Sequence, residues 1–218
     1  MQANQELTGA AGAGSTAGRR RKSRKREAII GAAKDMFFRE GYAGASMDRI
    51  TSLAGVSKAT IYNHFRSKEE LLIAVVEAVV LPLQSDYASA LDDHAPLGTW
   101  LIQLGHLLVH QILLPDLSAL ARLVIAEAPR LPKIGQIFER IAVYSSLEAL
   151  KPRLDQAVRE HELRPCDTMT ALRHFAEMAA GPLQYKMLLN VENLPAEAEI
   201  RQHVADVTEV FLHGYSLR

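Results

Sequence analysis

The amino-acid sequence predicts an all-α protein of about nine helices, arranged as a small N-terminal domain of three helices and a larger helical domain. Apolar residues recur at helical spacing along most of the chain, and proline stands at most of the expected helix boundaries. We find no convincing strand alternation and no internal repeat. The 218 residues are 48% apolar, which is enough for a buried core and argues against wholesale disorder.

The first 26 residues are expected to form a disordered tail that ends in a basic arm. Residues 1–18 are mostly small or polar and cannot bury enough surface to offset the entropy of ordering. Arg19–Arg26 then place seven basic residues in eight positions. This cluster is either a solvated charged segment or an arm that follows DNA phosphates or enters a minor groove, with Arg24 and Lys25 as contacts.

Charge is distributed unevenly along the chain, although the formal net charge is zero. Residues 1–80 hold 13 basic and 8 acidic residues, whereas residues 81–218 hold 12 basic and 17 acidic residues. An asymmetry of this kind suggests that the N-terminal end meets nucleic acid or an anionic membrane, while the rest of the chain does something else.

Residues 27–72 are predicted to form the small three-helix domain. A helical period starts at Glu27 and places four apolar residues on one face, namely Ile29, Ala33, Met36 and Phe37. Gly41 is expected to end this helix, because glycine tolerates the left-handed conformation that follows many helices.

Two short helices are expected next, Met47–Ala54 and Lys58–His64, capped by Ser46 and Ser57. Gly55 separates them and can adopt a positive φ at a sharp turn, which is the geometry of a helix-turn-helix. The second short helix presents residue types that read base edges or hold phosphate, namely Lys58, Ala59, Tyr62 and Asn63.

A fourth helix is expected to begin at Ser67, because Ser67 and Glu70 have the spacing of a capping box, and to be limited by Pro82. Residues 73–218 form the predicted larger domain. Its expected helices are Leu97–Leu114, Asp116–Arg130, Lys133–His161, Thr168–Asn190 and Ala196–Tyr215.

The chain resembles the TetR family of bacterial transcriptional regulators over about forty-five residues, AAKDMFFREGYAGASMDRITSLAGVSKATIYNHFRSKEELLIAVV. A second segment, ALARLVIAEAPRLPKIGQIFER at residues 119–140, looks like the C-terminal region of the AefR-like branch. The resemblance implies that Ser57 to Phe65 form the recognition helix. It further implies a phosphate near Ser46, backbone contacts from Tyr62, His64 and Lys68, and base or phosphate contacts from Lys58, Ala59, Thr60 and Asn63.

Several residues of the larger domain are candidates for the lining of a ligand cavity between helices. They are apolar or amphipathic, although plain core packing is the alternative for each of them: Trp100, His106, His110, Tyr144, Phe175, Tyr185 and Met187. The expected ligand is a small apolar or amphipathic effector.

The last two helices carry apolar faces that would be core in a monomer. The resemblance implies instead a four-helix interface of a homodimer, with two helices from each subunit, formed by Leu172, Phe175, Ala176, Ala179, Leu183, Ile200, Val204, Val207 and Phe211. A dimer also makes physical sense, because two recognition helices on a pseudo-palindrome roughly double the contact energy of one. Pro182 lies within one of these helices and is expected to kink it or to shift its contacts.

Catalysis and metal binding are not expected. His106 and His110 have the i, i+4 spacing of metal ligands, but the sequence offers no identifiable third ligand, so we assign neither metal nor cofactor. The single cysteine, Cys166, excludes an intrachain disulfide and fits a cytoplasmic protein, and its neighbour Arg164 raises the alternative of a redox-active thiol. No apolar run approaches the ~20 residues that a membrane helix requires.

The predicted function is therefore that of a ligand-responsive regulator, expected to be a repressor, that binds double-stranded operator DNA as a homodimer. One alternative is a sequence-indifferent DNA-binding protein, because the basic arm alone would bind any duplex. Another is a metal-dependent enzyme that uses His106 and His110.

Overall fold

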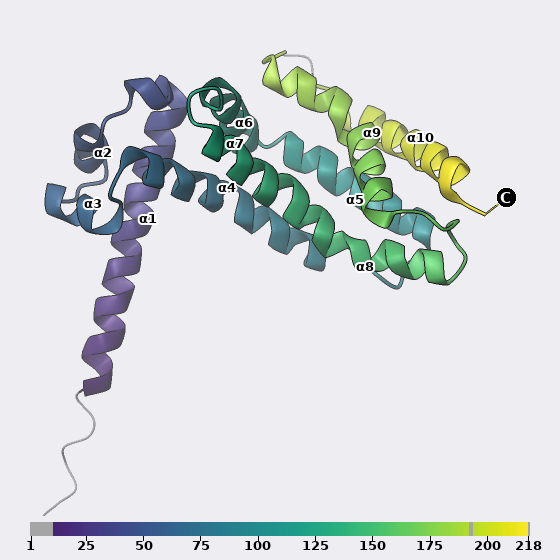
Figure 1. Cartoon of the computed structure of the whole chain (residues 1–218), viewed down its shortest axis with the longest axis horizontal. Helices are drawn as coiled ribbons and strands as arrows, with labels where there is room; N and C mark the ends of the chain where they lie inside the picture. The colour runs from purple at the N-terminus through teal and green to yellow at the C-terminus, as the bar shows by residue number, and fades with distance from the viewer. Residues whose placement is uncertain (1–10, 192–193, 218) are drawn as a thin grey trace, which may run out of the picture. The chain divides into compact units, whose positions relative to one another are not determined.

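The computed structural model describes residues 11–191 and 194–217, with the side chains of residues 11–19, 84–89, 143, 144 and 146 left out. The described residues form ten α-helices and one π-helical stretch without a strand, as Figure 1 shows. The all-α class is therefore confirmed. The chain divides into two compact units, Met1–Val75 and Val76–Arg218, close to the boundary that we expect after residue 72.

The first helix, α1 (Ala11–Gly44), begins much earlier than the expected start at Glu27. The basic segment therefore lies within a helix and is not an extended arm, and the predicted tail is helical from Ala11 onward. Alanine, arginine and lysine are strong helix formers, and Ser23 donates a hydrogen bond to Glu27 one turn later. The first ten residues of the predicted tail lie outside the described residues. Gly41, with φ 72°, interrupts the helix where we expect its end.

The helix-turn-helix follows as α2 (Met47–Leu53) and α3 (Lys58–His64). Gly55 takes a φ of 64° in the turn between them, so the positive φ expected there is confirmed. Ile50 of α2 and Ile61 of α3 are fully buried, and both helices pack against α1.

Helix α4 (Lys68–Ala90) starts where the capping box predicts, since the Ser67 hydroxyl accepts a hydrogen bond from the Glu70 N–H. The Glu70 carboxylate in turn accepts a hydrogen bond from the Arg66 N–H. The expected end at Pro82 is wrong, because Pro82 lies inside the helix. The Gln111 amide donates to the backbone carbonyl of Leu83, so a side chain from another helix supports the backbone just after the proline.

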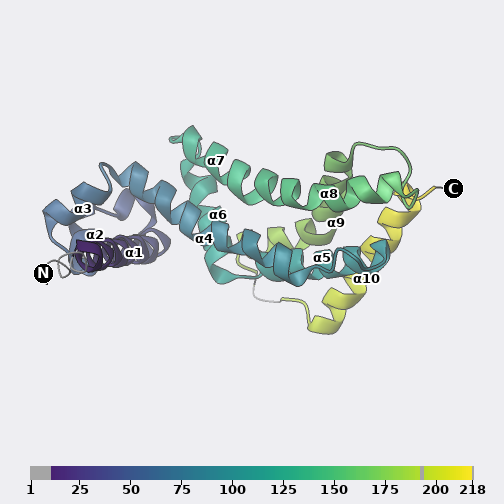
Figure 2. The ribbon, with the colours of Figure 1, turned by 90° about the horizontal axis from the view of Figure 1, so that it is seen from below.

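The second unit consists of the last turns of α4 and six further helices. Their bounds are α5 (Leu97–Ile112), α6 (Pro115–Glu127), α7 (Pro132–Phe138), α8 (Ser145–Arg159), α9 (Thr168–Leu188) and α10 (Glu197–Tyr215). Figures 1 and 2 show α5, α9 and α10 side by side, and their buried faces pack against one another. Trp100, Phe175 and Phe211 lie at the centre of this core and are almost fully buried.

The expected single helix Lys133–His161 is divided by a π-helical stretch, η1 (Glu139–Tyr144). The carbonyl of Arg140 accepts hydrogen bonds from both the N–H and the hydroxyl of Ser145, five residues later. This i to i+5 pairing sets the wider turn, which the apolar period of the sequence does not reveal.

Helices α5 and α10 approach each other closely at one point. A Cβ atom added at Gly105 would lie 2.6 Å from Cγ1 of Val204, which is less than any normal contact. Only glycine fits at this position without a shift of one helix. Among the described residues, no single helix has both the length and the apolar composition to span a membrane. Helices α5 and α6 reach that length and composition only when taken together, and the chain bends by 67° between them.

Candidate functional site

The outer face of α3 carries four of the predicted DNA-reading residues. Ile61 of α3 and Phe65, directly after the helix, are buried. The opposite side of the helix is exposed and carries Lys58, Ala59, Tyr62 and Asn63. Ser57 caps the helix, because its hydroxyl accepts a hydrogen bond from the Thr60 N–H at 3.2 Å. The Thr60 hydroxyl lies 2.8 Å from the Ser57 hydroxyl, so both predicted contacts take part in the cap.

The start of α2 is fixed from two sides. The Ser46 hydroxyl accepts a hydrogen bond from the Arg49 N–H, as expected for an N-cap. The Arg49 guanidinium contacts both carboxylate oxygens of Glu40 near the end of α1, and Glu40 raises the pKa of Arg49. This bidentate pair ties α2 to α1 and orients the helix-turn-helix.

A basic groove lies between the N-terminal half of α1 and the end of α3. It is lined by Arg21, Lys22 and Lys25 of α1 and by Thr60, Asn63 and His64 of α3. Lys25 therefore joins three residues that the helix-turn-helix pattern identifies, whereas Arg24 does not line the groove. Arg21 and Lys22 belong to the predicted basic arm Arg19–Arg26 but are not singled out there as contacts. Arg21 and Lys25 have the i, i+4 spacing that places both on one face of a helix.

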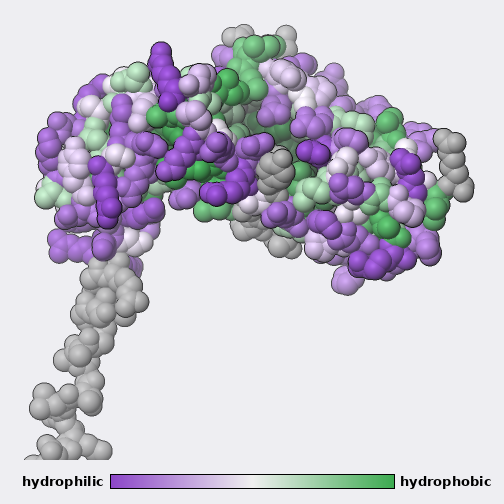
Figure 3. Space-filling model, viewed as in Figure 1, coloured by the Kyte–Doolittle hydropathy of each residue, from purple (hydrophilic) through white to green (hydrophobic). Residues whose placement is uncertain are grey.

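The groove combines the cationic side chains of arginine and lysine with hydrogen-bonding side chains of α3. Residues of these types are typical of contacts with DNA phosphates. Arg26 lies outside it, over the ring of Phe65 with its guanidinium carbon 5.3 Å from the ring centroid. This contact attaches the basic segment of α1 to the core of the first unit. Figure 3 shows that hydrophilic residues dominate the visible face of this unit.

His64 provides a titratable group in the basic groove. Burial, followed by the charges of Lys22, Arg26 and Lys25, lowers the pKa of its imidazole below the ordinary value of 6.5. The free chain therefore holds this ring neutral at neutral pH. A phosphate placed in the groove would favour the protonated ring and raise its pKa again.

We therefore expect DNA affinity to rise as the pH falls through the interval between these two pKa values of His64. Within that interval the complex binds more protons than the free chain, so lowering the pH strengthens DNA binding. Above both pKa values His64 is neutral in both states, and affinity no longer depends on its titration. Affinity measured at constant salt from about pH 8 to 5.5 checks this. His64→Gln should flatten the profile, and an unchanged profile in that variant would contradict a role for His64.

Lys58 is paired with Asp48 of α2, with Nζ 2.8 Å from the carboxylate. The hydrogen bond to Asp48 raises the pKa of Lys58. Both side chains are about two-thirds exposed, so the pair is weak and leaves the ammonium available to another partner.

Lys68 has a different environment from the one expected for a phosphate contact. Its half-buried ammonium donates to the backbone carbonyls of Tyr42, at 2.7 Å, and Ala45, at 2.8 Å. It also lies 4.3 Å from the centroid of the Tyr42 ring. Lys68 thus holds the segment between α1 and α2, and its predicted contact with DNA stays a prediction.

Lys68→Met should lower the free energy of unfolding by about 1–3 kcal/mol, because two carbonyl groups lose a charged donor. Thermal or urea unfolding measures this change. Lys58→Met removes an exposed cation of the same unit and should alter stability by less than about 0.5 kcal/mol. Normal stability of Lys68→Met with weakened DNA binding would instead assign Lys68 to phosphate.

A cavity of about 160 Å³ lies within the second unit, among α5, α6, α7, α8, α9 and the π-helical stretch. Most of its lining is apolar, including Leu108, Leu117, Phe138, Leu147, Ala176 and Met187. Polar groups are few, namely Gln111, Ser118, Arg173, Glu177 and Gln184. A mainly apolar wall with a few polar groups is typical of a site for a small organic ligand.

Among the predicted cavity residues whose side chains are described, Met187 alone lines this cavity. Trp100 and Phe175 are core residues, and the Trp100 indole N–H donates to Asp93. Tyr185 is 71% exposed. His106 and His110 are also absent from the lining, and the side chain of Tyr144 lies outside the described residues. Helical spacing separates buried from exposed faces but does not say where buried faces fail to meet, so the sequence alone does not locate this cavity. Contact of the other predicted residues with an effector stays a prediction.

The residues predicted for a dimer interface belong mainly to the core of one chain. Eight of the nine are buried within it, namely Leu172, Phe175, Ala179, Leu183, Ile200, Val204, Val207 and Phe211. The ninth, Ala176, is half-buried and lines the cavity. The exposed large apolar side chains here are Tyr185 of α9, Leu189 directly after α9, and Val210 of α10.

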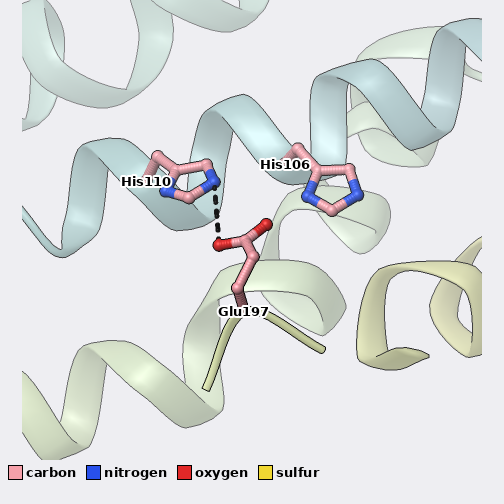
Figure 4. Close-up of side chains that lie close together, drawn as sticks. All are labelled: His106, His110 and Glu197. Atoms are coloured by element: carbon pink, nitrogen blue, oxygen red, sulfur yellow. Dashed lines mark ion pairs between the residues drawn. The ribbon is translucent and has the colours of Figure 1, made fainter. Parts of the chain in front are cut away.

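The structure also bears on two alternatives that the sequence left open, namely a redox-active Cys166 and a metal site at His106 and His110. Burial raises the pKa of the Cys166 thiol despite the nearby Arg164, so the thiol is not activated. His106 and His110 lie beside the carboxylate of Glu197, the first residue of α10, as Figure 4 shows. Sequence spacing cannot identify this third residue, because it comes from a distant helix.

Comparisons with known proteins agree with both units. A sequence model described as "Bacterial regulatory proteins, tetR family" matches residues 29–75. Another, described as "AefR-like transcriptional repressor, C-terminal domain", matches residues 99–217. The Escherichia coli (strain K12) regulator RutR is 39% identical over 89 residues, which span 40% of this chain and 42% of RutR.

Solved structures extend the similarity over most of the chain. A TetR-family regulator from Mesorhizobium loti is 28% identical with a TM-score of 0.79, over 90% of this chain and 99% of the other. The flavonoid-responsive regulator FrrA is also 28% identical, with a TM-score of 0.78 and the same coverage.

Proposed function

Since the chain belongs to the TetR family of bacterial transcriptional regulators, we propose that it is a repressor that binds operator DNA as a homodimer and responds to a small molecule. The observation that carries this proposal is that the two units have different surface features. The first unit has an exposed recognition helix beside a basic groove, and the second has an apolar cavity.

The DNA contacts are proposed to be of two kinds. The exposed side chains of α3 would reach base edges in a major groove, with Lys58 and Asn63 as hydrogen-bonding groups and Ala59 as an apolar contact. The basic side chains of the groove and Tyr62 would hold phosphates, which position the protein but carry no sequence information.

A homodimer is proposed because one seven-residue recognition helix contacts too few base pairs for useful specificity. Two copies related by a twofold axis would place their recognition helices about 34–36 Å apart on a pseudo-palindrome. The exposed apolar side chains of α9 and α10, rather than their buried faces, are the proposed contact between copies.

The proposed effector is a small apolar or amphipathic molecule. A dry cavity of about 150 Å³ is known to admit a molecule of the size of benzene, so the cavity of about 160 Å³ holds one ring or a short chain. A larger molecule, such as the flavonoid class to which FrrA responds, would have to open the cavity. Ser118 and Gln184 would contact its polar groups.

The two functions are proposed to communicate through α4, which begins in the first unit and continues into the second. An effector that prefers a second position of α4 would change the spacing of the recognition helices. Differential affinity of about 1–3 kcal/mol between the two states is enough for such coupling.

The decisive experiment is selection of genomic fragments by the purified full-length chain at physiological salt with excess nonspecific competitor. Enrichment of one or a few sites with inverted symmetry supports a dimeric regulator. Binding without any preferred site supports a sequence-indifferent DNA-binding protein and contradicts the proposal. Transcription from an enriched promoter, measured with and without the protein, then separates repression from activation.

Filling the cavity should abolish the effector response and leave DNA binding intact. Ala176→Phe places a ring where a half-buried alanine lines the wall, at a cost to stability of about 1–3 kcal/mol from overpacking. The measurement is release of the selected operator by a panel of single-ring aromatics, short fatty acids and flavonoids. Ala205→Phe, at an exposed position of α10, is the control. An equal response in both variants would place the effector elsewhere.

A further inference from the structure

We propose that His106, His110 and Glu197 form a binding site for one divalent transition-metal ion, with Zn²⁺ as the expected ion. The site lies on the surface of the second unit, between α5 and α10. None of its three residues lines the effector cavity, so it is a separate site and goes beyond the proposed regulatory function.

The three side chains already converge. Each offers one ligand atom, and these atoms all lie within 4.8 Å of one another. His106 and His110 are one turn apart on α5, with ring centroids 6.2 Å apart and ring planes inclined by 21°. The Glu197 carboxylate reaches them from the first turn of α10, with one oxygen 3.8 Å from Nε2 of His110. Figure 4 shows the carboxylate directed toward the two imidazoles.

The donor set is one that zinc prefers. Two neutral imidazoles and one carboxylate occur in zinc sites with distances of about 2.0–2.2 Å, so tetrahedral ligand atoms stand about 3.4 Å apart. The present atoms must therefore approach by about 1.4 Å at most. Small side-chain rotations can supply this movement, because His110 and Glu197 are each about half exposed. Three protein ligands leave a fourth position for water or another ligand.

The backbone that carries the ligands is held in place. Gly105, next to His106, packs against Val204 of α10 so closely that a Cβ atom would clash. Val109, next to His110, belongs to the same buried cluster as Val204 and Ile200, the latter one turn after Glu197. Since the two helices are fixed by this packing, binding requires little ordering of the backbone.

One competing interaction is present but weak. Arg201 Nη1 lies 3.7 Å from Oε1 of Glu197, whereas Oε2 is the oxygen near His110, and the Arg201 and Glu197 side chains are more than half exposed. An exposed pair of this kind contributes at most about 1 kcal/mol, and it leaves the second carboxylate oxygen free for the metal.

The test uses the full-length chain, freed of metal with a chelator, and Zn²⁺ alone. Isothermal titration and equilibrium dialysis should give one ion per chain. His106→Asn and His110→Asn should each weaken binding about tenfold or more, and Glu197→Gln should do the same. His213→Asn, an exposed histidine at the other end of α10, should bind like the unaltered chain.

Two spectroscopic readouts keep the test independent of any DNA-binding activity. Co²⁺ bound to the unaltered chain should give the visible absorption of a tetrahedral nitrogen–oxygen site, and each of the three variants should lose it. Circular dichroism verifies that the variants fold. Absence of stoichiometric binding, or equal binding by all three variants and the control, would overturn the proposal.

Discussion

Replacing Arg21, Lys22 and Lys25 together by glutamine is expected to reduce the salt dependence of DNA binding strongly. Each neutralised phosphate contributes about 0.9 to the slope of log K against log salt, so three contacts contribute about 2.7 per chain and about 5 per dimer. At 0.15 M salt this corresponds to a loss of about a hundredfold in affinity per chain. The expectation rests on the position of these three residues beside α3.

The measurement is affinity for the selected operator at several salt concentrations. A control variant removes three exposed cations from the second unit, Arg130, Lys133 and Arg140. It should leave the slope unchanged. If the triple variant of α1 also left the slope unchanged, the basic part of this helix would have no contact with phosphate. A loss of affinity for one sequence only would instead assign these residues to base reading.

Val210→Glu is expected to dissociate the dimer and with it to abolish operator binding at nanomolar protein. Val210 is 60% exposed on α10 and lies with Tyr185 and Leu189 among the exposed apolar residues of the last two helices. Because of the twofold axis, each subunit contributes one substituted residue to the interface. Two carboxylates without partners would therefore be removed from water when the dimer forms. The cost is several kcal/mol, enough to raise the dissociation constant by orders of magnitude.

Sedimentation equilibrium and operator binding measure the two parts of this expectation. Tyr185→Glu should act in the same way, whereas Ile125→Glu on α6, where the isoleucine is equally exposed at 60%, should leave the dimer intact. Dissociation by Ile125→Glu but not by Val210→Glu would place the interface on α6. A monomer before any substitution would contradict the proposed homodimer.

The helix caps and the tight turn were predicted correctly from the sequence, because serine at an N-cap and glycine at a positive φ each have a specific conformational role. The caps at Ser46, Ser57 and Ser67 and the turn at Gly55 all lie where the sequence predicts them. Each depends on a hydrogen bond or a positive φ within a few residues, so no tertiary information is needed. The exposed side of α3 follows from these boundaries.

The remaining features depend on tertiary contacts between distant segments. The basic segment has no apolar face to reveal its helix, and its approach to the end of α3, with Arg26 packed over Phe65, is a tertiary contact. The cavity is the place where six elements fail to fill space, which no single helical pattern records. Glu197 meets His106 and His110 only after α10 has packed on α5.

The close approach at Gly105 also limits how this protein can be made more stable by design. A common approach is to replace helical glycines by alanine, which lowers the entropy of the unfolded chain. That approach suits Gly31 and Gly214, where an added methyl group meets nothing within 4 Å. At Gly105 the same change would push α5 away from Val204. Thermostabilised variants should therefore keep residue 105 as glycine and change the other two.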